Sequence, residues 1–275
     1  MPMDEHEDFA DHDEPARGLT VFGNPWVDWL APPIVAGLGV LVSQTFLSFL
    51  LQRFYIWVHE FGHATVAWLT GKRALPLPIG WTNIGSERSH FVYFGILVLL
   101  AVLFIAGMRE RKPWPMVIAV FIAVLQYYMT WKMPESVATM WLAFGGIGGE
   151  FYLSAAMMAL FYVELPNKFR WGACRYFFLF IGAGTFFRSY ILWKQIKRGE
   201  EAIPMGSMLH GEEDAGGDMN TLHGDYGWTN REIIHTYNNL ADACLLALVI
   251  VYLAFALRLH HLPAWIRAQV AGRAE

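Results

Sequence analysis

Two histidines with a glutamate between them form the most informative motif of the chain, His59-Glu60-Phe61-Gly62-His63. A spacing of four residues places both imidazoles on one face of a helix, where they can bind the same metal ion. Zinc held by two neutral imidazoles and a third ligand lowers the pKa of bound water to about 7, and a neighbouring carboxylate can then take the proton. The motif therefore predicts a Zn²⁺ site with His59 and His63 as ligands and Glu60 as the catalytic base.

The surroundings of the motif favour a metal site over a chance match. The same pattern occurs in soluble helices as an exposed polar patch, but here it lies inside the apolar stretch 54–70. Ionisable groups inside an apolar span cost a few kcal/mol each, so three of them within five residues need a compensating partner. A metzincin would carry a further histidine six residues after His63, where this chain has Leu69. The third ligand must come from elsewhere, and the candidates are Glu87, Glu150, His210, Asp218, His223 and His235.

Asp218 is the predicted third metal ligand. The paired glycines Gly216 and Gly217 precede it and let the backbone approach a metal ion closely. His210 and His223 flank Asp218 in the same polar region and would instead make a site of three histidines. Both alternatives require this region to dip towards the membrane face.

The amino-acid composition indicates whether the chain lies in water or in a lipid bilayer. Hydrophobic residues make up 55% of the 275 residues, charged residues make up 16%, and the mean hydropathy is +0.33. These values are unusual for a soluble protein and favour the lipid bilayer. The chain carries a net charge of -4, and its acidic residues are concentrated in 1–14 and 200–225. This distribution argues against nucleic acid as a partner.

The apolar windows predict an all-α, polytopic membrane protein of six or seven transmembrane helices, since a span needs roughly 20 apolar residues. The stretch 54–70 follows the first window with only Gln52 and Arg53 between them, so the two stretches form either two helices joined at a sharp bend or one long tilted helix. The six other windows are 33–51, 91–108, 114–131, 137–163, 176–193 and 234–257.

Two connections between these windows carry structural information. Pro76, Pro78 and Gly80 lie in 71–90, which resists helix and predicts a re-entrant or extended loop after the HExxH helix. The polar loop 194–230 ends in a capping box formed by Thr229 and Glu232, which predicts the start of the last helix. The expected organisation is an acidic tail over 1–31, a transmembrane metalloprotease-like domain over 32–258 and a C-terminal tail over 259–275.

Glu150 and Arg188 fall inside predicted membrane helices, where neither is left unpaired in hydrocarbon. We expect them to approach each other as an ion pair or to share a polar cavity that faces the site. The glycines of 145–149, next to Glu150, predict close packing of this helix against a neighbour.

The stretch from Val58 to Gly71, VHEFGHATVAWLTG, together with Lys72-Arg73 and the later LPIGW at 77–81, resembles the first core helix and the following re-entrant β-type loop of site-2 proteases. These are intramembrane zinc metalloproteases. Their third zinc ligand is an Asp followed by Gly near a later core helix, which the Gly-Gly-Asp at Asp218 resembles. The GGIGGE run at 145–150 is similar to their glycine-rich middle core helix.

The resemblance implies hydrolysis of peptide bonds in membrane protein or peptide substrates by a multi-pass protein of the cell (inner) membrane. Two other functions compete with it. One is a non-proteolytic membrane subunit whose metal site is structural, closed by four protein ligands and without use for a base such as Glu60. The other is a membrane di-iron oxidoreductase, for which His260 and His261 would have to join further histidines in a second metal site.

Overall fold

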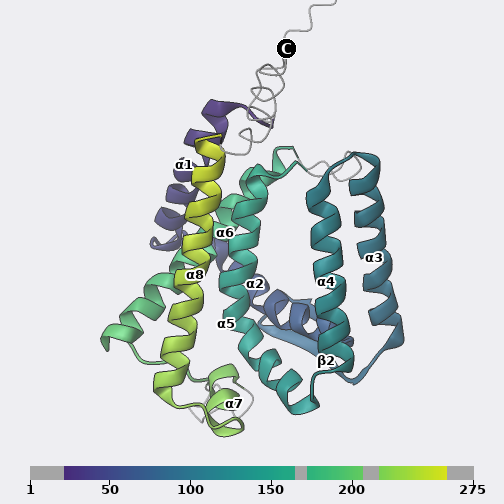
Figure 1. Cartoon of the computed structure of the whole chain (residues 1–275). Coiled ribbons are helices and arrows are strands. Elements are labelled where there is room, and N and C mark those ends of the chain that lie inside the picture. The colour runs from purple at the N-terminus through teal and green to yellow at the C-terminus, as the bar shows by residue number, and fades with distance from the viewer. Residues whose placement is uncertain (1–21, 165–171, 207–216, 259–275) are drawn as a thin grey trace, which may run out of the picture.

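The computed structural model describes residues 22–164, 172–206 and 217–258. Helices dominate, and one small antiparallel sheet is present (Figure 1). The predicted tails 1–31 and 259–275 lie mostly or wholly outside the described residues. The elements in chain order are α1 (Pro25–Ser43), α2 (Ser48–Leu69), β1 (Lys72–Leu77), β2 (Trp81–Arg88), α3 (His90–Arg109), α4 (Pro113–Trp131), α5 (Glu135–Ala159), η1 (Leu160–Tyr162), α6 (Cys174–Arg198), α7 (Asp218–Gly224) and α8 (Asn230–Ala256).

Six of the described helices are long and apolar enough to cross a membrane: α1, α3, α4, α5 with its extension η1, α6 and α8. The chain is therefore an all-α, multi-pass membrane protein, as its composition predicts. The pair α3 and α4 presents large apolar side chains outwards, and Phe91, Leu99, Val117 and Phe121 are 65% to 82% exposed. Such a surface suits contact with lipid.

The structure decides between one long helix and two helices at the start of the chain. α1 ends at Ser43 and α2 begins at Ser48, so the metal motif lies on a helix of its own. The predicted window 33–51 was wrong at both ends. Helix α1 begins at Pro25, where the Asn24 side chain accepts a hydrogen bond from the Trp26 backbone N–H, and the window also took in the first residues of α2.

The other predicted membrane helices agree closely with the structure, whereas the predicted polar loop 194–230 contains the end of α6 and the short helix α7. The capping box is present, because the Thr229 hydroxyl accepts from the Glu232 N–H while the Glu232 carboxylate accepts from the Thr229 N–H. Helix α8 starts immediately after it. The segment that follows the HExxH helix is extended, as expected: it forms the hairpin of β1 and β2, entered through Gly71 at φ +76°.

The hairpin is fastened to the helices at both of its ends. The indole N–H groups of Trp57 and Trp68 donate to backbone carbonyls of β1 at Pro76 and Ala74, each at 3.2 Å. At the base of the hairpin, the buried Lys72 forms an ion pair with Glu135, the first residue of α5. The hairpin is thereby positioned relative to both α2 and α5.

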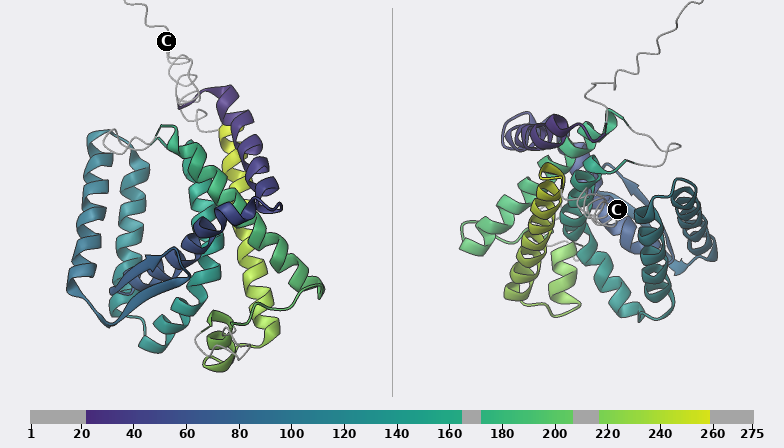
Figure 2. Two further views of the ribbon diagram at one scale, coloured as in Figure 1. Left: turned by 180° about the vertical axis from the view of Figure 1, so that it is seen from behind. Right: turned by 45° about the horizontal axis from the view of Figure 1, so that its top comes forward.

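Helix α5 occupies the centre of the arrangement. α3 and α4 stand as a pair on one side of it, while α1, α6 and α8 lie on the other (Figure 1, Figure 2). α2 crosses close against α5, and the close approach depends on glycines. A Cβ on Gly62 would overlap the carbonyl oxygen of Gly145, and a Cβ on Gly149 would overlap the Cα of Gly62. The glycines beside Glu150 therefore serve close helix packing, as predicted.

A single methyl group at this crossing should destabilise the fold. We expect Gly149→Ala to lower the free energy of unfolding by about 1–3 kcal/mol, because an overpacked contact between two backbones cannot relax by rotating a side chain. Thermal unfolding of the purified protein in detergent measures the change. Gly95→Ala on α3 is the matched control, since no atom lies within 4 Å of a Cβ placed there. Equal losses in the two variants would contradict the packing argument.

Candidate metal centre

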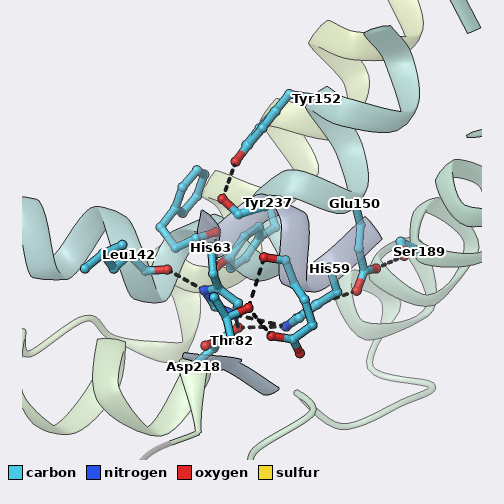
Figure 3. Close-up of polar contacts among 12 residues, drawn as sticks. His59, His63, Thr82, Leu142, Glu150, Tyr152, Ser189, Asp218 and Tyr237 are labelled. Carbon is cyan, nitrogen blue, oxygen red and sulfur yellow. Dashed lines mark hydrogen bonds and ion pairs between the residues drawn. The ribbon is translucent and has the colours of Figure 1, made fainter. Parts of the chain in front are cut away.

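The imidazoles of His59 and His63 converge on one point, as their spacing predicts (Figure 3). Their Nε2 atoms are 3.3 Å apart, and Asp218 Oδ2 lies 3.2 Å from His59 Nε2 and 3.3 Å from His63 Nε2. The three atoms form a nearly equilateral triangle. In a tetrahedral zinc site with bonds of roughly 2.0–2.1 Å, two ligand atoms are about 3.3–3.4 Å apart. The triangle has the size that such a site requires.

The Nδ1 atoms of the two imidazoles determine their tautomers, and so the direction of the Nε2 lone pairs. His63 Nδ1 lies 2.7 Å from the Leu142 carbonyl oxygen, and His59 Nδ1 lies 2.7 Å from Glu150 Oε1. A carbonyl oxygen only accepts hydrogen bonds, so His63 must carry its proton on Nδ1, and the carboxylate acts in the same way on His59. Both Nε2 lone pairs are then directed into the triangle, as in zinc sites where a further shell of groups orients the ligands.

Asp218 Oδ2 supports the same interpretation. This oxygen is buried, and no donor hydrogen is directed at it despite the two nearby nitrogens. A buried carboxylate oxygen without a hydrogen bond is costly unless another positive group satisfies it. A divalent cation at the centre of the triangle would satisfy Oδ2 and both Nε2 atoms together.

Gly146 leaves the space that the centre needs. A Cβ placed on this residue would overlap Asp218 Oδ2 and both histidine Nε2 atoms. Gly146 is buried within α5, so the absence of a side chain keeps the three ligand atoms clear rather than permitting a turn. The size of the triangle, the orphaned oxygen and the space at Gly146 fit a metal ion with nitrogen and oxygen ligands, for which zinc is a suitable choice.

The short helix α7 brings Asp218 to the triangle from a distant part of the sequence. Asp218 is its first residue, and the apolar side chains of Met219 and Leu222 are buried in the core formed with α5, α6 and α8. Asn220 exchanges two hydrogen bonds with the backbone of Gly206, at 3.0 and 3.2 Å, and so ties α7 to the segment that follows α6.

The remaining candidates for the third ligand differ in their placement. Within the described ranges, His59, His63 and Asp218 form the one group of three residues able to hold a metal ion. Glu87 and His235 are exposed, and His223 Nδ1 pairs with the Trp228 carbonyl oxygen at 2.7 Å. His210 lies outside the described residues.

Glu60 lines the same cavity as the three ligand residues and is held by the hairpin. Its side chain is buried, and the Thr82 hydroxyl of β2 contacts both its carboxylate, at 2.5 Å, and its backbone carbonyl, at 3.1 Å. Thr82 thus fixes the carboxylate of the predicted base. The sequence alone did not single out Thr82, because nothing in the spacing 60–82 indicates the contact.

The metal triangle opens on a cavity of about 750 Å³. The hairpin residues that line it all belong to β2 or to the turn before β2, so this strand faces the cavity and β1 does not.

Glu150 and Arg188 both line the cavity, which confirms the prediction that they share a polar cavity. The two side chains do not form an ion pair with each other. Glu150 accepts hydrogen bonds from His59 and from the Ser189 hydroxyl, while Arg188 donates to Gln52.

Comparison with known proteins found no match for this chain among protein-family models, curated proteins or solved structures.

Loss of the Asp218 carboxylate should empty the centre. We expect Asp218→Ala to abolish stoichiometric metal binding, because two imidazoles remain without the buried anion that completes the triangle. Elemental analysis of the purified protein measures bound metal. His223→Ala is the control, since this residue pairs with a backbone carbonyl, and it should keep its metal. Full metal content in Asp218→Ala would show that the third ligand lies elsewhere.

Glu150 should strengthen the centre without touching the metal. Replacing it with Gln gives the His59 Nδ1–H group a weaker hydrogen-bond acceptor, and the affinity for zinc is expected to fall about 10- to 100-fold. Competition with a chelating dye measures this affinity. Glu87→Gln, an exposed change of the same kind on β2, should leave the affinity unaltered. An unchanged affinity in Glu150→Gln would mean that His59 needs no carboxylate to orient it.

Proposed function

We propose that this chain is an intramembrane zinc metalloprotease related to the site-2 proteases, and that it hydrolyses peptide bonds of membrane protein or peptide substrates. The observation that carries the proposal is the triangle of His59 Nε2, His63 Nε2 and Asp218 Oδ2, with Glu60 on the wall of the same cavity. Three protein ligands leave a fourth position of a tetrahedral ion open, which is typical of catalytic rather than structural zinc. The cell (inner) membrane is the proposed location.

The mechanism divides the work between the metal and the chain. His59, His63 and Asp218 would hold the zinc ion, which would supply the Lewis acidity that polarises a substrate carbonyl and makes water acidic near neutral pH. Glu60 accepts a proton from that water and returns it to the leaving amine. Thr82 holds the Glu60 carboxylate in place, and Glu150 keeps the His59 lone pair aimed at the metal.

The hairpin suits the presentation of an extended substrate. A helical substrate hides its carbonyls in backbone hydrogen bonds, so it must unwind locally before hydrolysis. β2 faces the cavity and pairs with β1 along its other edge. A substrate segment can add to the sheet as a further strand at β2, beside the Glu60 carboxylate.

Two observations weigh against the competing functions. A structural site would close the metal with a fourth protein ligand, and the described residues supply three. A di-iron site would need a second cluster of ligands, and the described part of the chain contains one cluster; His260 and His261 lie outside the described residues.

Replacement of the base separates metal binding from catalysis. Glu60→Gln should retain zinc while hydrolysis of a fluorogenic transmembrane peptide in bicelles falls by about 100-fold or more, because proton transfer by a positioned side chain contributes roughly 10²- to 10⁴-fold. Glu201→Gln, an exposed change outside the cavity, should keep both properties. The proposal fails if zinc-loaded wild-type protein cleaves no member of a transmembrane peptide library, or if Glu60→Gln cleaves as fast as wild type.

A further inference from the structure

Arg188 lies within α6, a helix able to span the membrane, and its side chain lines the cavity of the metal centre. Its guanidinium donates to Gln52 Oε1 at 2.7 Å and lies 5.4 Å from the ring centroid of Tyr55. Among the described residues, no carboxylate is within ion-pair distance of it. An arginine in a membrane-spanning helix normally pairs with an anion or serves a functional site.

The carboxylates on the cavity wall are engaged elsewhere. Glu60 is held by Thr82, Glu150 by His59 and Ser189, and Asp218 faces the two imidazoles, as described above. Arg188 therefore presents a positive charge to the cavity with a neutral amide and an aromatic ring as its contacts. The guanidinium therefore lacks an anionic partner, which a ligand in the cavity can supply.

The position of Arg188 relative to the metal follows from α2. Gln52, Tyr55, His59 and His63 line the cavity from one face of this helix. Gln52 and His59 are seven residues apart, so the Arg188–Gln52 pair lies about 10 Å along the helix from the metal ligands. An extended peptide advances about 3.3 Å per residue, and three residues therefore cover this distance.

The direction of β2 makes the same path available to a peptide. A Cβ on Gly80, in the turn just before β2, would lie 3.9 Å from Ile56, and Thr82 of β2 contacts Glu60. β2 therefore runs along α2, and a strand added to it passes from the metal ligands towards the end of the cavity where Gln52 and Arg188 meet.

We propose that Arg188, oriented by Gln52, forms a subsite for a carboxylate of the substrate about three residues from the scissile bond. A guanidinium offers two parallel N–H groups to a carboxylate, and its hydrogen bond to Gln52 reduces the freedom that binding must remove. The subsite makes the enzyme select substrates with an acidic residue next to the cleaved segment. It rests on the proposed protease function for the position of the scissile bond, but its charge preference can be measured by binding alone.

The binding experiment uses full-length, zinc-loaded Glu60→Gln protein, so that bound peptide is not consumed. The probes are fluorescent, C-terminally amidated Ala/Leu/Val peptides in bicelles that carry one Glu, moved one residue at a time, each with a Gln counterpart. We expect the best Glu peptide to bind about tenfold or more tightly than its Gln counterpart, as charged hydrogen bonds imply. Adding Arg188→Gln should remove the difference, and adding Arg188→Glu should instead favour a Lys peptide.

A second arm compares each Gln peptide with a free and an amidated C-terminus. A preference for the free carboxylate identifies the end of the substrate chain as the source of the anion and still supports the subsite. Arg109→Gln, an exposed change at the end of α3, is the matched control and should keep the Glu preference. Equal affinity for Glu and Gln peptides at every position overturns the subsite, as does a preference that survives Arg188→Gln in protein with full zinc content.

Cleavage by the Glu60-containing protein then locates the subsite. Mass spectrometry of the products should place the preferred Glu about three residues from the cut, with the preference expressed mainly in KM. A Glu preference in binding without any cleavage by wild-type protein would sustain the subsite and overturn the protease proposal. Cleavage that ignores the position of Glu would sustain the protease and overturn the subsite.

Discussion

The close approach of α2 to α5 is the constraint on which the rest of the structure depends. Backbone contact at Gly62, Gly145 and Gly149 brings the two helices nearer than any side chain would allow. At that separation a backbone carbonyl of α5 reaches the Nδ1 atom of His63, and a carboxylate of α5 reaches that of His59. The absence of a side chain at Gly146 leaves the space between the ligand atoms. One packing interaction thus sets the orientation of the ligands and the room for an ion.

Four elements bring their polar groups together at the centre. α2 supplies the imidazoles and Glu60, α5 supplies Glu150, β2 supplies Thr82, and α7 supplies Asp218. Each alone would be costly in an apolar surrounding, since a buried polar group without a partner loses the hydrogen bonds it made with water. Their mutual arrangement explains how a chain that is 55% hydrophobic can hold so many ionisable groups near one point.

Several sequence expectations were right about which residues matter and incomplete about what they contact. Glu150 was weighed as a metal ligand and as a partner of Arg188, and the structure pairs it with His59 and Ser189 instead. Arg188 shares its cavity but bonds to Gln52. A charge in an apolar helix signals that a partner exists. Its identity depends on the rotation and separation of helices, which local pattern does not encode.

The sequence by itself determined the elements: helix-forming apolar windows, the extended segment after Gly71, the capping box at Thr229 and the shared helical face of His59 and His63. These follow from interactions between residues close together in the chain. The first window was misplaced because hydropathy does not detect a helix start set by Asn24 or a bend between two apolar stretches. The sequence proposed Asp218 from six candidate ligands, but only the tertiary structure decided that it meets the histidines, since it lies more than 150 residues from them and arrives through the burial of Met219 and Leu222. Contacts of that kind depend on packing in three dimensions, so no spacing in the sequence could reveal them.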